Sequence, residues 1–415
     1  MAEVKSNGRP AGLPRGPEGG AGGAGPRLSR RFAGGACPND VALTRADLEA
    51  AGVRLTDLTD SNPTHYGLGD QRALDAVARA ASRATVYAPD PRGPMVAREA
   101  LAARYGGSPW DYWLTASTSE AYSWVFAALT DPGDAIAIPS PGYPLIEPLA
   151  ALSSVRTVTY PWHYLHPYGW WADTGVITGL ADREDLRAFV LVNPENPAGV
   201  YTDDATADAV VATCQRAGAA LISDEVFGPF ALDGEPASLA GDDRAVTFAL
   251  GGLSKTLCAP QLKLAWLRLS GPRGALGSVR EVLDQIADTY LSVGTPVAMA
   301  LPELLDLSDD VARVTRARLA GNLATARRIL GEAPYRVRRC EGGWTAIVDV
   351  PRYLPDGDLA IYLMREAHLA VHPGWFYDVP DSGTLALSLL PEPADFETRC
   401  RHLRTAVDTL GGTLG

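Results

Sequence analysis

The feature that most constrains this chain is a lysine on a glycine-bearing turn directly after an apolar segment. Residues 245–250 (AVTFAL) predict a buried strand, and residues 251–255 (GGLSK) follow without a gap. Such a turn holds a lysine amine at the edge of a sheet, where it can meet a bound carbonyl compound. Lys255 is therefore a candidate Schiff-base residue, although an isolated Ser-Lys pair more often lies on a solvated surface.

Length, charge and cysteine usage argue against several classes of protein. The 415 residues are too many for one simple core and predict two or three lobes. The net charge of −12, without a basic stripe, argues against nucleic-acid binding. The five cysteines are scattered and form no CxxC pair, so they suggest no disulfide framework and no metal site, and they fit the reducing cytoplasm. No segment approaches the roughly 20 apolar residues that cross a bilayer, so we expect no membrane partner.

Apolar segments that alternate with helix-like segments predict βαβ units. Residues 189–192 and 219–223 are apolar without alternation, as are parallel strands that are buried on both faces. Asn196 follows the first segment, Asp224 the second, and Lys255 the strand described above. Ligands bind at the carboxyl ends of strands in open parallel sheets, so we expect these three side chains at one edge of an α/β fold.

Two further segments offer groups for a ligand. Thr118 and Ser119 begin an apolar helix, where hydroxyls, backbone N–H groups and the helix dipole favour a phosphate. The alternative is helix capping, which is the commoner role of Ser and Thr. Tyr143 follows the apolar strand at 135–139, where its ring could stack on a planar ligand, although ordinary packing is the commoner role of such an aromatic ring.

Together these residues meet the chemical requirements of pyridoxal 5′-phosphate. Lys255 would bind its aldehyde and Asp224 would keep its pyridine nitrogen protonated. Asn196 would donate to its phenolic oxygen and Tyr143 would stack on its ring. Thr118 and Ser119 would hold its phosphate.

The chain also resembles the fold-type I pyridoxal phosphate enzymes, specifically the class I/II aminotransferases, over about residues 55–410. The motifs that carry the resemblance are NPENPAG at 193–199, DEV at 224–226, SK at 254–255 and PGWF at 373–376. The resemblance implies a large domain with a mostly parallel sheet plus a smaller α+β domain. It also implies transfer of an amino group between an amino acid or amine donor and a keto acid, with Lys255 moving the proton.

Further cofactor-binding residues follow from the same resemblance. Ser254 and Lys263 would lie near the phosphate, and Tyr87 would reach the phosphate of the neighbouring subunit. The expected assembly is a homodimer with shared active sites. Lys263 stands where the family usually has an arginine, and a lysine can still bind phosphate as a point charge.

Two other departures concern the substrate and the Schiff base. Phe227 stands where the family usually has a tyrosine, which predicts a less acidic Schiff base. Ala386 stands where the family usually has the arginine that grips the α-carboxylate as a bidentate pair. Either another group holds the carboxylate, with Asn62 and Arg92 as candidates, or the substrate is not an ordinary α-amino acid.

Alternatives remain open at this stage. The fold also supports elimination, cyclisation, decarboxylation and carbon–carbon bond formation. A non-catalytic ligand-sensing domain of a transcription regulator is less well supported, because residues 1–40 are too short and too rich in Gly and Pro for a helix-turn-helix domain. The Gly/Ala/Arg-rich composition and the altered carboxylate site favour bacterial specialised metabolism.

The expected domain order follows from these assignments. Residues 1–40 are expected to form a disordered tail, because they are rich in Gly, Ala, Pro and Arg. Residues 41–85 should contribute to the small domain and residues 86–300 should form the large cofactor-binding domain. Residues 301–415 should form the C-terminal small domain.

Overall fold

The structure is a computed structural model that describes residues 29, 31, 38–234, 236–291, 293–380 and 382–414. Most of the expected tail at 1–40 lies outside the described residues. Of the described helices, none is both long enough and apolar enough to span a membrane.

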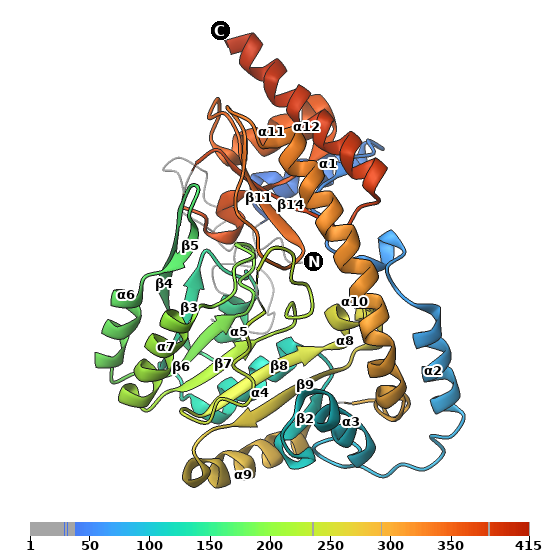
Figure 1. The fold of residues 1–415 in the computed structure, drawn as a ribbon, viewed down its shortest axis with the longest axis vertical. Helices are drawn as coiled ribbons and strands as arrows, with labels where there is room; N and C mark the ends of the chain where they lie inside the picture. Colours follow the sequence, from blue (N-terminus) through green and yellow to red (C-terminus); the bar gives the residue numbers. More distant parts are fainter. Residues whose placement is uncertain are drawn as a thin grey trace, which may run out of the picture.

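The larger of the sheets has eight strands in the order β2-β9-β8-β7-β6-β3-β4-β5 (Figure 1). The pairs among β8, β7, β6, β3 and β4 are parallel, whereas β9 pairs antiparallel with both β8 and β2, and β5 with β4. Strands β7 and β8 are buried throughout and β6 is buried except at Arg187, which explains the apolar residues that dominate these strands. The strands are β2 (Tyr112–Thr115), β3 (Ala135–Ser140), β4 (Arg156–Leu165), β5 (Gly169–Ala172), β6 (Leu186–Val192), β7 (Ala220–Asp224), β8 (Thr247–Gly252) and β9 (Ala265–Ser270).

Helices cover both faces of this sheet. On one face α4, α5 and α9 enclose a core that includes Phe126, Ile136 and Leu283. On the other face α6 and α7 pack over a core that includes Phe189 and Val210. The α/β class expected from the sequence is confirmed. These helices are α4 (Thr118–Leu129), α5 (Ile146–Leu152), α6 (Thr174–Gly179), α7 (Asp204–Ala217) and α9 (Arg273–Tyr290).

A smaller antiparallel sheet lies above the large one in Figure 1, in the order β10-β11-β14-β13. Helices α1, α11 and α12 lie beside it. The short strand β1 pairs in parallel with β12, so the N-terminal segment joins this smaller part. The elements are α1 (Asp40–Ala50), β1 (Thr56–Asp57), β10 (Arg336–Val337), β11 (Thr345–Asp349), α11 (Asp356–Ala367), β12 (Leu369–Ala370), β13 (His372–Pro373), β14 (Thr384–Ser388) and α12 (Pro393–Leu414).

Helix α10 (Thr295–Leu330) runs from the large sheet to the smaller part (Figure 1). Pro302 lies inside this helix, in its N-terminal part. This arrangement is compatible with the expected domain boundaries, which remain a proposal. The other elements are η2 (Pro63–Tyr66), α2 (Gln71–Ala81), α3 (Met95–Tyr105), η3 (Pro109–Asp111), η4 (Leu180–Asp182), α8 (Leu253–Thr256), η5 (Pro260–Leu262) and η6 (Gly374–Tyr377).

Candidate active site

Lys255 lies on the turn that follows the central strand β8. The strand ends at Gly252, and the short helix α8 begins at the next residue. Strand β9 passes so close that a Cβ at Gly251 would lie 2.6 Å from Trp266 Nε1, which explains the glycine there. The structure thus places Lys255 at the carboxyl end of a buried strand, where open α/β sheets bind ligands.

The Lys255 amine lies over aromatic rings. Its Nζ is 4.5 Å from the centroid of the Trp344 ring and 5.1 Å from that of the Phe227 ring. Within the described part of the chain, no ion pair to Lys255 is present. Burial lowers the pKa of the Lys255 amine to about 8, while Cys258 and Asp224 oppose that effect. An amine with a lowered pKa is a better nucleophile at neutral pH.

Asp224 closes strand β7, which is the neighbour of β8, and is only 4% exposed. Its Oδ2 accepts a hydrogen bond from the Tyr122 hydroxyl at 3.0 Å, and its Oδ1 accepts one from the Val226 N–H at 3.2 Å. Burial raises the pKa of Asp224 to about 6, and both hydrogen bonds oppose that rise. The carboxyl is therefore mostly ionised at neutral pH and suits a protonated ring nitrogen.

The two asparagines after strand β6 have different environments. Asn193 is buried and structural, because its Nδ2 donates to Ala237 O at 2.8 Å and its Oδ1 accepts from Thr202 N–H at 3.0 Å. Asn196 is partly exposed, and its side chain has no hydrogen-bond partner among the described residues. Of the two, Asn196 is thus the asparagine that can donate to a ligand.

Tyr143 lies beyond strand β3 and close to the Asp224 carboxylate. A Cβ at Gly142 would lie 2.4 Å from Pro139 O, so this turn requires a glycine. Gly142 N–H donates to Tyr377 O at 3.0 Å, which ties the turn to η6. Burial and the negative charge of Asp224 raise the pKa of Tyr143 to about 12, so it stays a neutral phenol.

At the start of α4, only Ser117 acts as a helix cap. Its hydroxyl accepts from Glu120 N–H at 3.2 Å, and the Glu120 carboxylate accepts from Ala116 N–H at 2.6 Å. The hydroxyls of Thr118 and Ser119 have no hydrogen-bond partner among the residues the structure describes. The capping interpretation therefore accounts for Ser117 and leaves the next two hydroxyls at a helix N-terminus, which suits an anion.

Three other expected cofactor residues are less closely tied to Lys255. Ser254 precedes it on α8 and is partly exposed. Lys263 is exposed at the end of η5, with a left-handed φ of 51°. Tyr87 is 75% exposed and makes no described contact with Lys255.

The two substrate candidates have their polar groups occupied. The Arg92 guanidinium binds Asp284 through Nε and Nη2, both at 2.6 Å, and Trp110 O through Nη1 at 2.6 Å. The guanidinium therefore has no free N–H edge that could bind a carboxylate in bidentate geometry. The Asn62 Oδ1 accepts from Thr64, and its Nδ2 lies 3.1 Å from a His65 ring nitrogen. Arg92 thus does not suit the substrate role that the sequence suggested for it.

Ala386 lies in a row of three residues across the small sheet, between Ile347 and His372. Residues paired in this way point to the same face. The His372 ring stacks on Phe376 at 4.4 Å, and its Nδ1 is 3.5 Å from the Tyr377 hydroxyl. Burial lowers the pKa of His372 to about 4, so the ring is neutral at pH 7. The position of the expected arginine therefore has an uncharged neighbour.

The described side chains fit pyridoxal 5′-phosphate. Lys255 offers an amine with a lowered pKa, and Asp224 offers an acid one strand away. Asn196 and the hydroxyls of Thr118 and Ser119 have no partner among the described residues, so they are available to such a ligand. Each requirement of the cofactor that we drew from the sequence has a residue in a suitable environment.

Residues 57–400 match the model of the family described as aminotransferase class I and II. The chain belongs to this family. Its members are pyridoxal phosphate enzymes, so this aminotransferase uses pyridoxal 5′-phosphate as its cofactor. The resemblance inferred from its four motifs is confirmed.

Similar proteins agree with this assignment. The aminotransferase is 28% identical over 396 residues to an alanine aminotransferase of Mycobacterium tuberculosis, covering 89% of this chain and 87% of the relative. It is 32% identical over 212 residues to the S-alkyl-thiohydroximate lyase SUR1 of Arabidopsis thaliana, covering 49% and 44% of the two chains. The solved alanine aminotransferase of Pyrococcus furiosus superimposes with a TM-score of 0.84 at 23% identity, over 92% of this chain and 100% of that chain. That likeness confirms the fold-type I architecture.

Each of these site residues has its own expected role in the aminotransferase. When bound, pyridoxal 5′-phosphate supplies an aldehyde and an electron-withdrawing ring. Asp224 would keep the ring nitrogen protonated, and Tyr122 would fix the orientation of that carboxylate. Lys255 would bind the aldehyde carbon and later hold the proton that is exchanged at the substrate's α-carbon.

Sequence reasoning missed Tyr122, Trp344 and His372. Tyr122 lies one helical turn after Thr118, so its place on the same face of α4 was a usable signal. Trp344 and His372 lie within the GGW and VHPGWF segments, but nothing in the sequence showed that those segments meet Lys255 or Ala386.

Proposed function

We propose that this aminotransferase moves an amino group between an amino acid or amine donor and a keto acid, with Lys255 as the residue that binds the cofactor and transfers the proton. The observation that carries the proposal is the Lys255 amine, which has a pKa lowered to about 8 one strand away from the buried Asp224. The proposed cofactor-binding residues are Lys255, Asp224, Asn196, Tyr143, Thr118, Ser119, Ser254, Lys263 and Tyr87.

Alanine is the first donor to test, since relatives matched over most of their length are named alanine aminotransferases. Ala386 and the neutral His372 ring make an unusual carboxylate site, so the panel also needs amines without a carboxylate. The holoenzyme is mixed with each donor in the absence of a keto acid. A true donor converts the cofactor to its pyridoxamine form and releases one keto acid or aldehyde, which mass spectrometry identifies.

The same experiment separates the alternatives. A product of elimination, cyclisation or decarboxylation, without the pyridoxamine form of the cofactor, would replace the transaminase proposal with other chemistry on this fold. Cofactor binding without consumption of any amine would favour a sensing role. The family match supports the transaminase outcome.

We further propose a role in bacterial specialised metabolism in the cytoplasm. The Gly/Ala/Arg-rich composition and the altered carboxylate site support the first part. Cys214, Cys258, Cys340 and Cys400 are all free and buried, which suits a reducing compartment. Donor identity from the panel tests the metabolic role, because a common proteinogenic donor with high turnover would argue for central metabolism.

We also propose that the enzyme is a homodimer with shared active sites. Val86 and Tyr87 are exposed apolar residues of one loop, and Tyr290 and Leu291 are exposed at the end of α9. Tyr87 and Leu291 line the same surface pocket, so these two exposed side chains belong to one patch. A second copy of the chain would cover the patch and receive Tyr87 at its phosphate.

Hybrid dimers test this arrangement. Lys255→Ala and Tyr87→Ala subunits are each expected to have little activity alone, the second through weak cofactor binding. Because a hybrid dimer holds one site with both residues intact, mixed subunits should regain about a quarter of the wild-type activity. Dimers without such recovery would show that Tyr87 does not serve the partner's site.

A further inference from the structure

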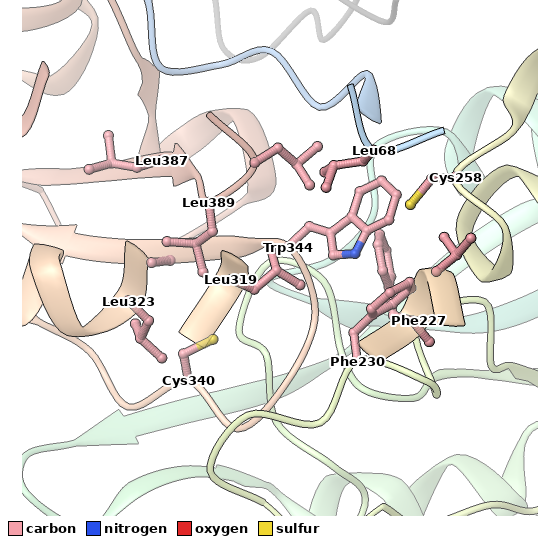
Figure 2. Close-up of a cluster of buried hydrophobic side chains, with 14 of the residues drawn as sticks. Leu68, Phe227, Phe230, Cys258, Leu319, Leu323, Cys340, Trp344, Leu387 and Leu389 are labelled. Atoms are coloured by element: carbon pink, nitrogen blue, oxygen red, sulfur yellow. The ribbon is translucent and has the colours of Figure 1, made fainter. Parts of the chain in front are cut away.

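A buried aromatic cluster lies beside the amine of Lys255. Figure 2 shows the Trp344 indole at its centre, with Phe227, Phe230, Leu68 and Cys258 around it. Phe227 and Phe230 meet the Trp344 ring edge to face, with centroids 5.5 Å and 5.2 Å away. The cluster joins the segment between β7 and β8 to the segment just before β11.

The backbone holds Trp344 from two sides. Leu389 N–H, just past β14, donates to Trp344 O at 2.9 Å. Gly343 N–H donates to Phe230 O at 3.0 Å, which links the tryptophan segment to the large part of the molecule. With its backbone hydrogen-bonded on two sides and its ring packed against Phe227 and Phe230, the indole offers the flexible lysine side chain a well-ordered surface.

We propose that Trp344 is a positioning residue for Lys255: its ring face, together with that of Phe227, holds the free amine at the reaction site while the substrate occupies the cofactor. This inference rests on the proposed function, in which Lys255 is released and then moves a proton. An ammonium is attracted to the negative face of an aromatic ring, most strongly to tryptophan. Both ring centroids lie within the roughly 6 Å over which that attraction acts.

A purely structural role explains Trp344 less well. The side chain is 2% exposed, and its Nε1 has no hydrogen-bond partner in the described part of the chain. A phenylalanine would fill much of the same space without burying an unpaired N–H group. Trp344→Phe should therefore fold well and keep an aromatic face, whereas Trp344→Leu should fold but lose that face.

The titration of Lys255 reports on this contact. Protonation of the amine is favoured by the ring faces and by Asp224 and Cys258, the charged and titratable groups that act on it, and is opposed by burial. Replacing the aromatic face with an aliphatic one should therefore lower the pKa of Lys255 further. From the strength of such contacts we expect a decrease of about 0.5 to 1 unit.

The chain offers a clean measurement because it contains three lysines, Lys5, Lys255 and Lys263. Lysine labelled with ¹³C at Cε gives one NMR signal for each, and the Lys255→Ala variant identifies the signal of interest. The titration is carried out on the full-length enzyme loaded with pyridoxamine 5′-phosphate, which leaves Lys255 free. Trp124→Leu is the matched control, because Trp124 is also buried with an unpaired Nε1 but has no ring contact with the amine in the described structure.

The expected result is a lower pKa of Lys255 in Trp344→Leu, with Trp344→Phe and Trp124→Leu close to wild type. An unchanged pKa in Trp344→Leu would overturn the proposal, because the ring would not be holding the amine. A raised pKa would overturn it as well, since the ring would then serve only to exclude water.

Single-turnover kinetics supply a second readout. Trp344→Leu should lower the rate of the proton-transfer half-reaction roughly tenfold or more, with little change in KM and with recovery in Trp344→Phe. A change confined to KM would contradict a positioning role. The NMR titration does not depend on turnover, so failure of the transaminase proposal and failure of this one give different results.

Discussion

The Tyr122 hydroxyl donates to Asp224 Oδ2 at 3.0 Å and so joins helix α4 to the end of strand β7. This hydrogen bond favours the ionised form of a carboxyl that burial would otherwise neutralise. It thereby links the phosphate end of the proposed site, where α4 begins, to the end that would hold the ring nitrogen.

Tyr122→Phe should raise the pKa of Asp224 above its value of about 6, because one hydrogen bond to the carboxylate is lost. In the pH profile of kcat/KM, the acidic limb should then move to higher pH by about 0.5 to 1 unit. Tyr160→Phe is the matched control, since that buried hydroxyl donates to the backbone oxygen of Val190. Identical acidic limbs in wild type and Tyr122→Phe would show that Asp224 does not set this limb.

Lys255→Met should stabilise the enzyme prepared without cofactor at pH 7. The native amine loses its proton near pH 8 and the unfolded one near 10.5, so between these values the native state binds fewer protons. Wild-type stability should therefore rise with pH across this window, and below it the charged amine destabilises the native state by about 3 kcal/mol. Urea unfolding at several pH values measures the difference, and exposed Lys263→Met should show none.

Glu195→Gln should remove a pH dependence of the opposite sign. Glu195 is 1% exposed, and burial raises its pKa from 4.5 to about 8. The native state holds this proton where the unfolded chain has lost it, so stability falls as the pH rises from about 4.5 to 8. The variant should be more stable than wild type at pH 8 by about 4 kcal/mol, with a smaller gain at pH 5. Exposed Glu99→Gln serves as the control in the same unfolding series.

Arg92→Ala should affect stability more than substrate binding. Its guanidinium makes two contacts with Asp284 and lies 4.5 Å from the Trp113 ring centroid. Loss of this partly buried pair should cost about 1–3 kcal/mol of unfolding free energy, with KM nearly unchanged. Asp284→Asn should cost a similar amount, and the double variant should cost less than the sum. A large increase in KM with normal stability would restore Arg92 as a substrate residue.

The sequence predicted best those functional side chains that directly follow an apolar strand. Lys255, Asp224 and Asn196 were predictable at one sheet edge because each follows an apolar strand, and neighbouring parallel strands end at the same edge. The pairing of Arg92 with Asp284 was not predictable, because it joins residues 192 positions apart. The same holds for Trp344 over Lys255, since that contact depends on how the smaller part packs against the large sheet.

The measurement that tests the central claim most directly is borohydride reduction of the holoenzyme, followed by peptide mass analysis. With three lysines in the chain, each possible attachment site falls on a separate and identifiable peptide. The structure predicts that the reduced cofactor is found on Lys255 alone and that Lys255→Ala carries none. Attachment to Lys263, or no attachment to the wild-type enzyme, would contradict the assignment of Lys255 as the cofactor-binding residue.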